Sequence, residues 1–464
     1  MGQTLQSLAR TRIQGLLDEN SFVEIGKKIT ARNTEFNLDE KRMPTDGVIT
    51  GYGLVDGNLV YVYSQDVSVL GGTVGEMHAK KIINLYDLAM KMGAPVVGFL
   101  DCGGVRLQEA TDALHAFGEI FTKQALASGV ILQIAAVFGV CGGGAAVIPA
   151  LADFAFMEQK NGQIFVNTPN ALKGNRTEIC NTSGAEFQSK EAGMADVTGT
   201  QEEILGKMRQ ILSMFPANNK DGISYAPCTD DLNRICQELQ QGSNAVDVVS
   251  QIADDRSFME MKADYASDMA TGFVKLNGGV VGCVANREQE ISANGAKKAA
   301  DFVSLCDAFQ VPVLTVTDAT GFKALVEDEK YMAKSVASCI RGFADATVPK
   351  VNVVTGKAYG TAYVAMNSKS TGADMVYAWP NAEIGMMDAN MAAKIMYQEA
   401  DAKELKEKAA QYEELQSGIE SAAARGYVDT VIEPTDTRKY VIGAFEMLYT
   451  KKEERAYKKH HTVS

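Results

Sequence analysis

Four turns rich in small residues are the segments of this sequence that could do chemistry. Each follows a run of apolar residues, and they occupy positions 101–105, 142–145, 318–322 and 360–362. A strand that ends in small residues and opens a helix leaves backbone N–H groups free of partners. Two such groups that converge on one point form an oxyanion hole, which stabilises an enolate or a similar anion. Packing turns and phosphate loops are the alternatives, although no turn fits the GxGxxG or Walker pattern.

The four turns belong to an internal repeat. When the chain is shifted by 217 positions, residues 79–145 fall on residues 296–362 without a gap. The shift places Asp101 on Asp318, and many of the other matches are at glycine and proline, which fix turns and close approaches of the backbone. Two unrelated α/β segments that share common residues are the alternative. The constant shift favours two similar domains, and hence two similar sites, one for each of two reactants.

Each copy predicts the same order of elements. A helix and a buried strand lead to an Asp-x-x-Gly turn, and a second helix and strand lead to the glycine-rich turn. The predicted helices that open the copies span 79–91 and 296–309, and the predicted strands span 95–100, 131–138, 312–317 and 348–354. This alternation is typical of layered α/β domains. We therefore expect an N-terminal domain over 1–215, a linker over 216–240 and a C-terminal domain over 241–464.

Composition narrows the classes of function. The formal net charge of the 464-residue chain is -13, which argues against a nucleic-acid partner. No apolar run reaches the roughly 18 residues of a membrane helix. The eight cysteines form no CxxC pair and the chain has only four histidines, so we expect no metal site. Scattered cysteines suit buried thiols in a reducing compartment, and we expect a cytoplasmic protein.

Several short motifs occur in order along nearly the whole chain. They are 46–53 (DGVITGYG), 101–109 (DCGGVRLQE), 141–145 (CGGGA), 357–360 (KAYG), 377–380 (YAWP) and 425–429 (RGYVD). Together they resemble the carboxyltransferase (beta) subunit of the biotin-dependent propionyl-CoA and acetyl-CoA carboxylases, and also the alpha subunit of biotin-dependent acyl-CoA decarboxylases. The resemblance implies two tandem crotonase-like domains of the ClpP/crotonase, ββα-superhelix type. It also implies an active site between subunits, with acyl-CoA on the N-terminal domain and biotin on the C-terminal domain.

The resemblance also assigns residues. By position, the N–H groups of Val105 and of Gly143 or Gly144 would hold the thioester oxygen. Those of Phe322 and Ala362, with Thr361, would hold the ureido oxygen of biotin. The residues assigned to ligand binding beside them are Gly104, Arg106, Gly321 and Gly360. For Arg106, a contact with a phosphate of CoA and a structural ion pair are both open.

The family mechanism needs no acid or base from the protein. Carboxybiotin releases carbon dioxide, the freed biotin nitrogen takes the α-proton, and the enolate attacks, which agrees with the shortage of histidine. His78 is accordingly expected to be structural. The resemblance implies biotin on a separate carrier protein, acyl-CoA as substrate and no metal. It further implies a biotin carboxylase or a membrane decarboxylase subunit as partner, and a homo-oligomer built from dimers, a hexamer.

Some features depart from the family or point elsewhere. Thr320 replaces a usual proline, Thr361 replaces a usual glycine, and the segment 323–332 does not match the family's loop. The tetrapeptide 89–92 (AMKM) reproduces a biotin attachment sequence, but it ends a predicted helix, and we expect no biotin there.

Other functions stay open beside carboxyl transfer to an acyl-CoA. The same residues would serve the alpha subunit of a sodium-translocating decarboxylase acting on methylmalonyl-, malonyl- or glutaconyl-CoA. A crotonase-type hydratase would need a carboxylate near a hole, for which Glu109 is the candidate, and a non-catalytic subunit would fit the altered loop.

Overall fold

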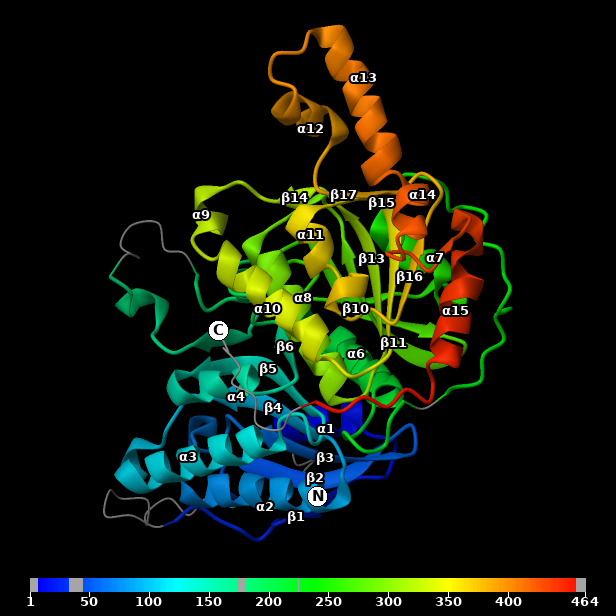
Figure 1. The fold of residues 1–464 in the computed structure, drawn as a ribbon. Helices are drawn as coiled ribbons and strands as arrows, with labels where there is room; N and C mark the ends of the chain where they lie inside the picture. Colours follow the sequence, from blue (N-terminus) through cyan, green and yellow to red (C-terminus); the bar gives the residue numbers. More distant parts are fainter. Residues whose placement is uncertain (1–6, 33–44, 174–180, 224, 456–464) are drawn as a thin grey trace. The chain divides into compact units, whose positions relative to one another are not determined.

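The computed structural model describes residues 7–32, 45–173, 181–223 and 225–455 (Figure 1). Contacts between Cα atoms divide the chain into two compact units, residues 1–222 and 223–464. The point of division lies inside the segment 216–240. Each unit is built on one mixed sheet of eight strands, most of them parallel.

The sheet of the first unit has the strand order β1-β2-β3-β4-β5-β6-β8, and β7 pairs with the far end of β5. Its strands are β1 (Val23–Ile25), β2 (Val48–Val55), β3 (Asn58–Gln65), β4 (Val96–Cys102), β5 (Gln133–Gly142), β6 (Phe154–Glu158), β7 (Gln163–Phe165) and β8 (Val197–Gly199). Its α-helices are α1 (Leu8–Leu16), α2 (Glu76–Met92), α3 (Ala110–Ala127), α4 (Val147–Ala150), α5 (Ala185–Lys190) and α6 (Gln201–Met214). Helix α2 packs against α3, and α1 packs against α6.

The second unit repeats this plan with the order β18-β16-β15-β13-β11-β10-β9, and β17 pairs with the far end of β15. Its strands are β9 (Met259–Met261), β10 (Met269–Leu276), β11 (Gly279–Asn286), β13 (Val313–Ala319), β15 (Lys350–Tyr359), β16 (Met375–Ala378), β17 (Glu383–Gly385) and β18 (Thr430–Val431), and β12 (Glu290–Ile291) pairs separately with β14 (Gly321–Phe322). Its helices are α7 (Ala245–Ile252), α8 (Ala293–Ala308), α9 (Val326–Glu329), α10 (Met332–Asp345), α11 (Gly360–Ala365), α12 (Ala389–Met396), α13 (Ala402–Tyr412), α14 (Ile419–Ala424) and α15 (Thr437–Met447). Figure 1 shows this sheet between α8 with α10 and α7 with α15.

The repeat holds at the level of single residues. Helix α8 begins 217 positions after α2, and strands β13 and β15 begin and end 217 positions after β4 and β5. The parallel ladders even share their irregularity, since the register shifts between Leu100 and Cys102 in one unit and between Thr317 and Ala319 in the other. The prediction of a repeated α/β structure is therefore confirmed.

Several predicted boundaries were wrong, including the start of α8 at Ala293 rather than 296 and the end of β15 at Tyr359 rather than 354, and for two of them the contacts give the physical reason. Helix α2 begins at Glu76 rather than 79, because its first N–H groups are capped from far along the chain. The amide of Glu76 donates to the Glu109 carboxylate at 2.7 Å, and that of His78 donates to the Asp46 carboxylate at 2.7 Å. Strand β5 continues to Gly142 rather than ending at 138, because its last residues pair with β7.

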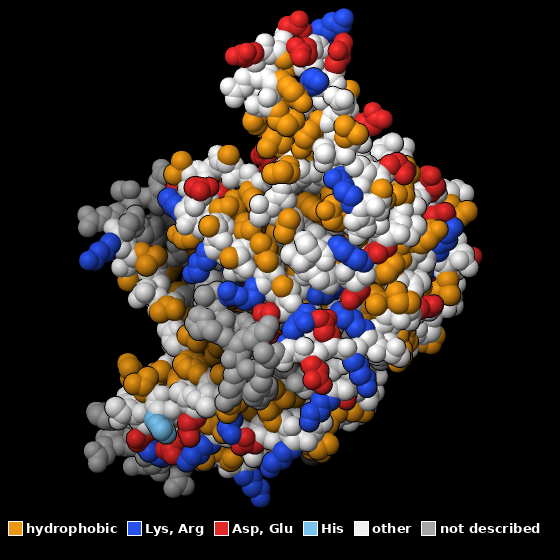
Figure 2. All heavy atoms as spheres, in the orientation of Figure 1, with side chains coloured by type: hydrophobic (Ala, Val, Ile, Leu, Met, Phe, Trp, Pro, Cys, Tyr) orange, Lys and Arg blue, Asp and Glu red, His pale blue; other side chains and the backbone are white. Residues whose placement is uncertain are grey.

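Two helices of the second unit lie outside the layers formed by the sheet and the helices that cover it. Helices α12 and α13 form a hairpin, here called the arm, that packs on itself through Ala389, Ala393 and Ala409 (Figure 1). Figure 2 shows hydrophobic side chains gathered on the arm, where Met391, Ile395 and Met396 are each more than half exposed. The segment between β7 and α5 in the first unit is far shorter than the segment between β17 and α14 that holds the arm.

Candidate active site

The amide of Val105 is directed away from the strand that holds its neighbours. Val74 donates to the carbonyl of Gly104 at 2.9 Å and accepts from the amide of Arg106 at 2.9 Å. In a parallel ladder the residue between two such bonds turns its own N–H to the opposite side. The amide of Val105 is thus turned away from this pairing, as an oxyanion hole requires.

Phe322 occupies the same position in the second unit. It pairs with Ile291 in the β12–β14 ladder, and the next amide, that of Lys323, donates to the carbonyl of Ile291 at 2.9 Å. By the same geometry, the N–H of Phe322 is directed away from β12. The altered residue Thr320 donates its amide to the carbonyl of Gln289 at 2.8 Å, a bond that a proline could not make.

The second half of each site is the beginning of a short helix. Gly143 and Gly360 open these helices with φ of 60° and 56°, in the left-handed region that favours glycine. The first N–H groups of a helix have no acceptor within it. The 217-residue shift aligns Gly144 with Thr361 and Ala145 with Ala362, so the sequence analysis did not assign the two holes to strictly equivalent residues.

The two halves adjoin in each unit. A methyl group added to Gly104 would lie 3.3 Å from the carbonyl oxygen of Gly142, so the two turns of the first unit are neighbours. In the second unit β14 contacts α11. The structure thus brings Val105 near Gly143 and Gly144, and Phe322 near Thr361 and Ala362, as the sequence analysis expected. Their roles in binding a ligand stay a prediction.

The thiol beside the first turn is not a nucleophile at neutral pH. Burial raises the pKa of Cys102 to about 11, and its sulfur accepts the amide of Gly104 at 3.2 Å. A protonated, buried thiol is unreactive. This thiol is therefore not a candidate nucleophile, and the backbone amides of the turn stay the candidate groups.

Arg106 is held inside the protein. Its side chain is 1% exposed, and its guanidinium binds the carboxylates of Asp46 and Glu109 and the carbonyl of Thr73. These contacts favour the structural ion pair over a contact with a phosphate. They also occupy Glu109, the candidate carboxylate of a hydratase, because its second oxygen caps α2.

His78 is structural, as expected. Its Nδ1 donates to the carbonyl of Asp46 at 2.9 Å, its Nε2 lies 3.4 Å from Nε2 of Gln65, and the side chain is fully buried. Burial, helped by the positive charge of Arg106, lowers its pKa to about 3. The folded chain therefore resists protonation of this ring.

This shift predicts a loss of stability in mild acid. As the pH falls below about 6.5, the unfolded chain takes up a proton on His78 that the folded chain does not, so the free energy of unfolding should drop by about 1.4 kcal/mol per pH unit. We expect His78→Gln to remove this contribution between pH 6.5 and 4.5. Urea denaturation of both proteins across that range measures it. Equal slopes for the two proteins would refute the assignment.

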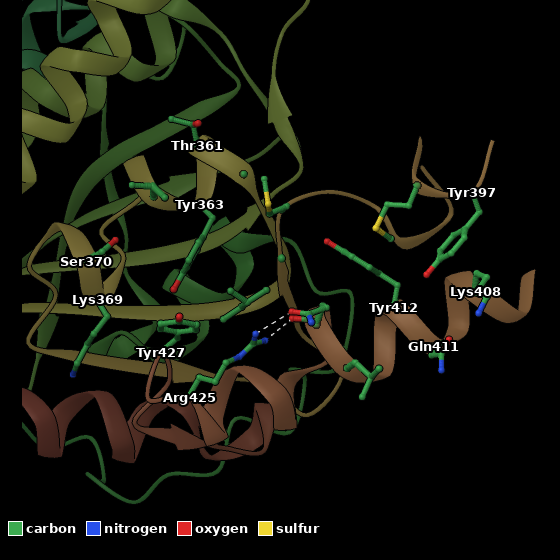
Figure 3. A pocket seen from close by; sticks show the side chains of 18 residues that line it. Thr361, Tyr363, Lys369, Ser370, Tyr397, Lys408, Gln411, Tyr412, Arg425 and Tyr427 are labelled. Atoms are coloured by element: carbon green, nitrogen blue, oxygen red, sulfur yellow. Dashed lines mark hydrogen bonds between the residues drawn. The ribbon is translucent and has the colours of Figure 1, made fainter. Parts of the chain in front are cut away.

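A cavity of about 930 Å³ opens beside the second site (Figure 3). It begins at Gly360 and Thr361, and the arm forms part of its wall. Its aromatic and apolar lining includes Tyr363, Tyr397, Tyr412, Tyr427, Met386 and Met396. Three cations lie on it: Lys408, Lys369, which pairs with Asp429, and Arg425, which donates to Gln416. Thr361 was expected from the sequence but the arm was not, since no residue of the arm matches a motif of the first copy.

The structure was also searched for metal sites and membrane-spanning helices, within the residues that it describes. Within them, no group of three or more His, Cys, Asp or Glu side chains could hold a metal ion. No helix in the same part of the chain is long and apolar enough to cross a membrane.

Comparisons with known proteins agree with this geometry. Residues 5–463 match the family model of the carboxyl transferase domain. The chain is 39% identical to the methylmalonyl-CoA decarboxylase subunit alpha of Propionigenium modestum, over 98% of this chain and 92% of that protein. It is 38% identical to the propionyl-CoA carboxylase beta chain of Roseobacter denitrificans, over 98% and 93%.

The solved structures give the same picture. The crystal structure of transcarboxylase 12S with methylmalonyl-CoA bound superposes with a TM-score of 0.94 at 36% identity, over 98% of this chain and 92% of that chain. The likeness confirms the expected crotonase-like fold in two domains.

Proposed function

The chain belongs to the carboxyl transferase family, and on that basis we propose that it moves a carboxyl group between biotin and a short-chain acyl-CoA. Biotin would be carried on a separate protein. The observation that carries the proposal is the duplicated pair of amide turns, because the transfer joins two reactants that each develop a negative oxygen.

The first unit would take the acyl-CoA. The amides of Val105 and of Gly143 or Gly144 would hold the thioester oxygen and stabilise its charge as the α-carbon becomes an enolate. Gly104 has a φ of 110°, which disfavours residues with a side chain. Without a side chain at this position, the backbone can come close to the ligand. Arg106 would act from inside, by fixing the turn that carries Val105.

The second unit would take biotin. Phe322, Ala362 and Thr361 would hold the ureido oxygen, while Gly321 and Gly360 keep the approach free of side chains. The adjoining cavity suits a partly apolar bicyclic ring, since tyrosine and methionine side chains line much of it beside its three cations. Bound there, carboxybiotin supplies the carboxyl group. The altered Thr361 keeps its N–H, so the replacement of glycine leaves this donor in place.

The relatives support a propionyl-CoA and methylmalonyl-CoA pair as substrate and product. They act in both directions, as carboxylase and as decarboxylase, at nearly equal identity. The second candidate is therefore the alpha subunit of a decarboxylase, with the same residues. We propose a biotin carboxyl carrier protein as partner in either case. A biotin carboxylase would accompany the first function and a membrane decarboxylase subunit the second. The chain itself would form a homo-oligomer built from dimers, a hexamer, and transcarboxylase 12S is a hexamer too.

Carboxyl exchange with free biotin tests the proposal. We expect the purified chain to convert methylmalonyl-CoA to propionyl-CoA when biotin is added, and to release little propionyl-CoA without it. Labelled carboxyl groups should pass to biotin. Crotonyl-CoA serves as a control, because a hydratase would add water to it. Hydration of crotonyl-CoA would refute the proposal, and no carboxyl transfer from methylmalonyl-, malonyl- or glutaconyl-CoA to biotin would favour a non-catalytic subunit.

A further inference from the structure

The two halves of the second site are joined by the side chain of Asp318, which begins the turn 318–322 that ends in Phe322. Asp318 lies at the register shift between β13 and β15, four residues before Phe322. Its carboxylate crosses to β15 and accepts the amide of Lys357 at 2.8 Å. Lys357 is three residues before Gly360, so a single carboxylate connects the strand ends that lead to both sets of amides.

Asp318 is itself held on three sides. Its amide donates to Oδ1 of Asn286 at 3.0 Å, and its carbonyl accepts from Nδ2 of the same side chain at 2.5 Å. Nε2 of Gln289 lies 3.1 Å from both carboxylate oxygens. A carboxylate bound in this way has one orientation, and it fixes the groups that it binds.

The backbone opposite is shaped to receive this carboxylate. A methyl group added to Gly356 would lie 2.5 Å from Oδ1 of Asp318, which is closer than two unbonded atoms can stand. The first unit repeats the arrangement, because a methyl group at Gly139 would overlap the Asp101 carboxylate. There Arg12 of helix α1 binds the carboxylate at 3.2 Å instead of a backbone amide.

The partners of Asp318 are neutral. Among the described residues, no lysine or arginine forms an ion pair with it, and its bonds come from amides. Its part is therefore that of an acceptor with a fixed direction, which an asparagine could also play. If Asp318 only stabilised the fold through an ion pair, its carboxylate would need a cation as partner.

We propose that Asp318 is a positioning residue for carboxyl transfer: it sets the distance between the amide of Phe322 and those of Thr361 and Ala362. The inference rests on the proposed function, and it adds a residue that touches neither reactant. A shift of about 1 Å in one donor can cost up to 100-fold in rate, so the loss of Asp318 should lower kcat while the KM for acyl-CoA, which binds the other unit, stays unchanged.

A double-mutant cycle tests this with methylmalonyl-CoA and free biotin. We expect Asp318→Ala and Gly356→Ala each to lower kcat about 10- to 100-fold, with the KM for methylmalonyl-CoA unchanged. The double variant should be no worse than Asp318→Ala, because the smaller side chain leaves room for the added methyl group. Asp318→Asn should recover most of kcat, since its Oδ1 can still accept the amide of Lys357.

Control variants separate a loss of positioning by Asp318 from a loss of folding. Asp301→Ala, at an exposed carboxylate paired with Lys297, should behave as the wild type. If Asp318→Ala fails to fold, Gln289→Ala removes an exposed partner and should lower kcat several-fold. A folded Asp318→Ala with normal kcat, additive losses in the double variant, or a normal Gln289→Ala would overturn the inference. An inactive wild-type protein would instead refute the proposed function.

Discussion

Replacing Thr361 with proline is expected to lower kcat for carboxyl transfer by about 100- to 1000-fold, the usual cost of removing one donor from an oxyanion hole. Proline lacks the N–H but fits the first turn of a helix, where that group has no partner within the helix. Thr361 is the second residue of α11 and its side chain is exposed, so the ring has room. The loss should therefore appear in catalysis and leave the fold intact.

The repeat supplies a matched variant in the other unit. Gly144 is the equivalent of Thr361, and a Cβ there would meet Phe117 at an ordinary 3.7 Å. Gly144→Pro should lower kcat by a similar factor. Thr361→Ala, which keeps the amide, should retain most of the activity. Steady-state rates with methylmalonyl-CoA and biotin measure all three, and circular dichroism checks folding. If the proline variants are as active as the alanine variant, the amides of residues 144 and 361 are not donors of the oxyanion holes.

Removing the charge of Arg106 should destabilise the protein by about 3–5 kcal/mol, because two carboxylates would remain buried without a cation. The side chains of Asp46 and Glu109 are 0% exposed and both are bound to Arg106. They also cap the first turn of α2, so the same substitution should loosen the start of that helix. Urea denaturation of Arg106→Met against the wild type measures the loss.

An exposed pair provides the control for this prediction. Lys123 and Asp87 form an ion pair with side chains 32% and 46% exposed, and such pairs contribute at most about 1 kcal/mol. Lys123→Met should therefore change the free energy of unfolding by less than that amount. If Arg106→Met costs no more than Lys123→Met, the buried cluster is not the stabilising unit that its contacts indicate.

The amide turns could be located from the sequence, but the distant contacts that hold the neighbouring elements in place could not. The constant shift identified β4, β5, β13 and β15, because a buried parallel strand is a run of apolar residues that can be read locally. The caps of α2 come from Asp46 and Glu109, about thirty residues away on either side, and no local pattern reveals a cap of that kind.

Two other features needed the coordinates. Arg106 had two readings in the sequence, since the same arginine can bind a phosphate or a buried carboxylate, and only its burial distinguishes them. The arm has no partner in the first copy, so the repeat gave no guide to it. The cavity that it lines was missed for that reason, although Thr361 at its edge was found.

The shift between the two units is constant at 217 positions from α2 to β5, becomes 220 at β7 and β17, and grows beyond them, where the arm is inserted. The two copies therefore have the same length from Glu76 to Gly142 and from Ala293 to Tyr359, and they differ in length outside these stretches. The spacing that places the two amide turns of one unit against each other is thus the same in both units.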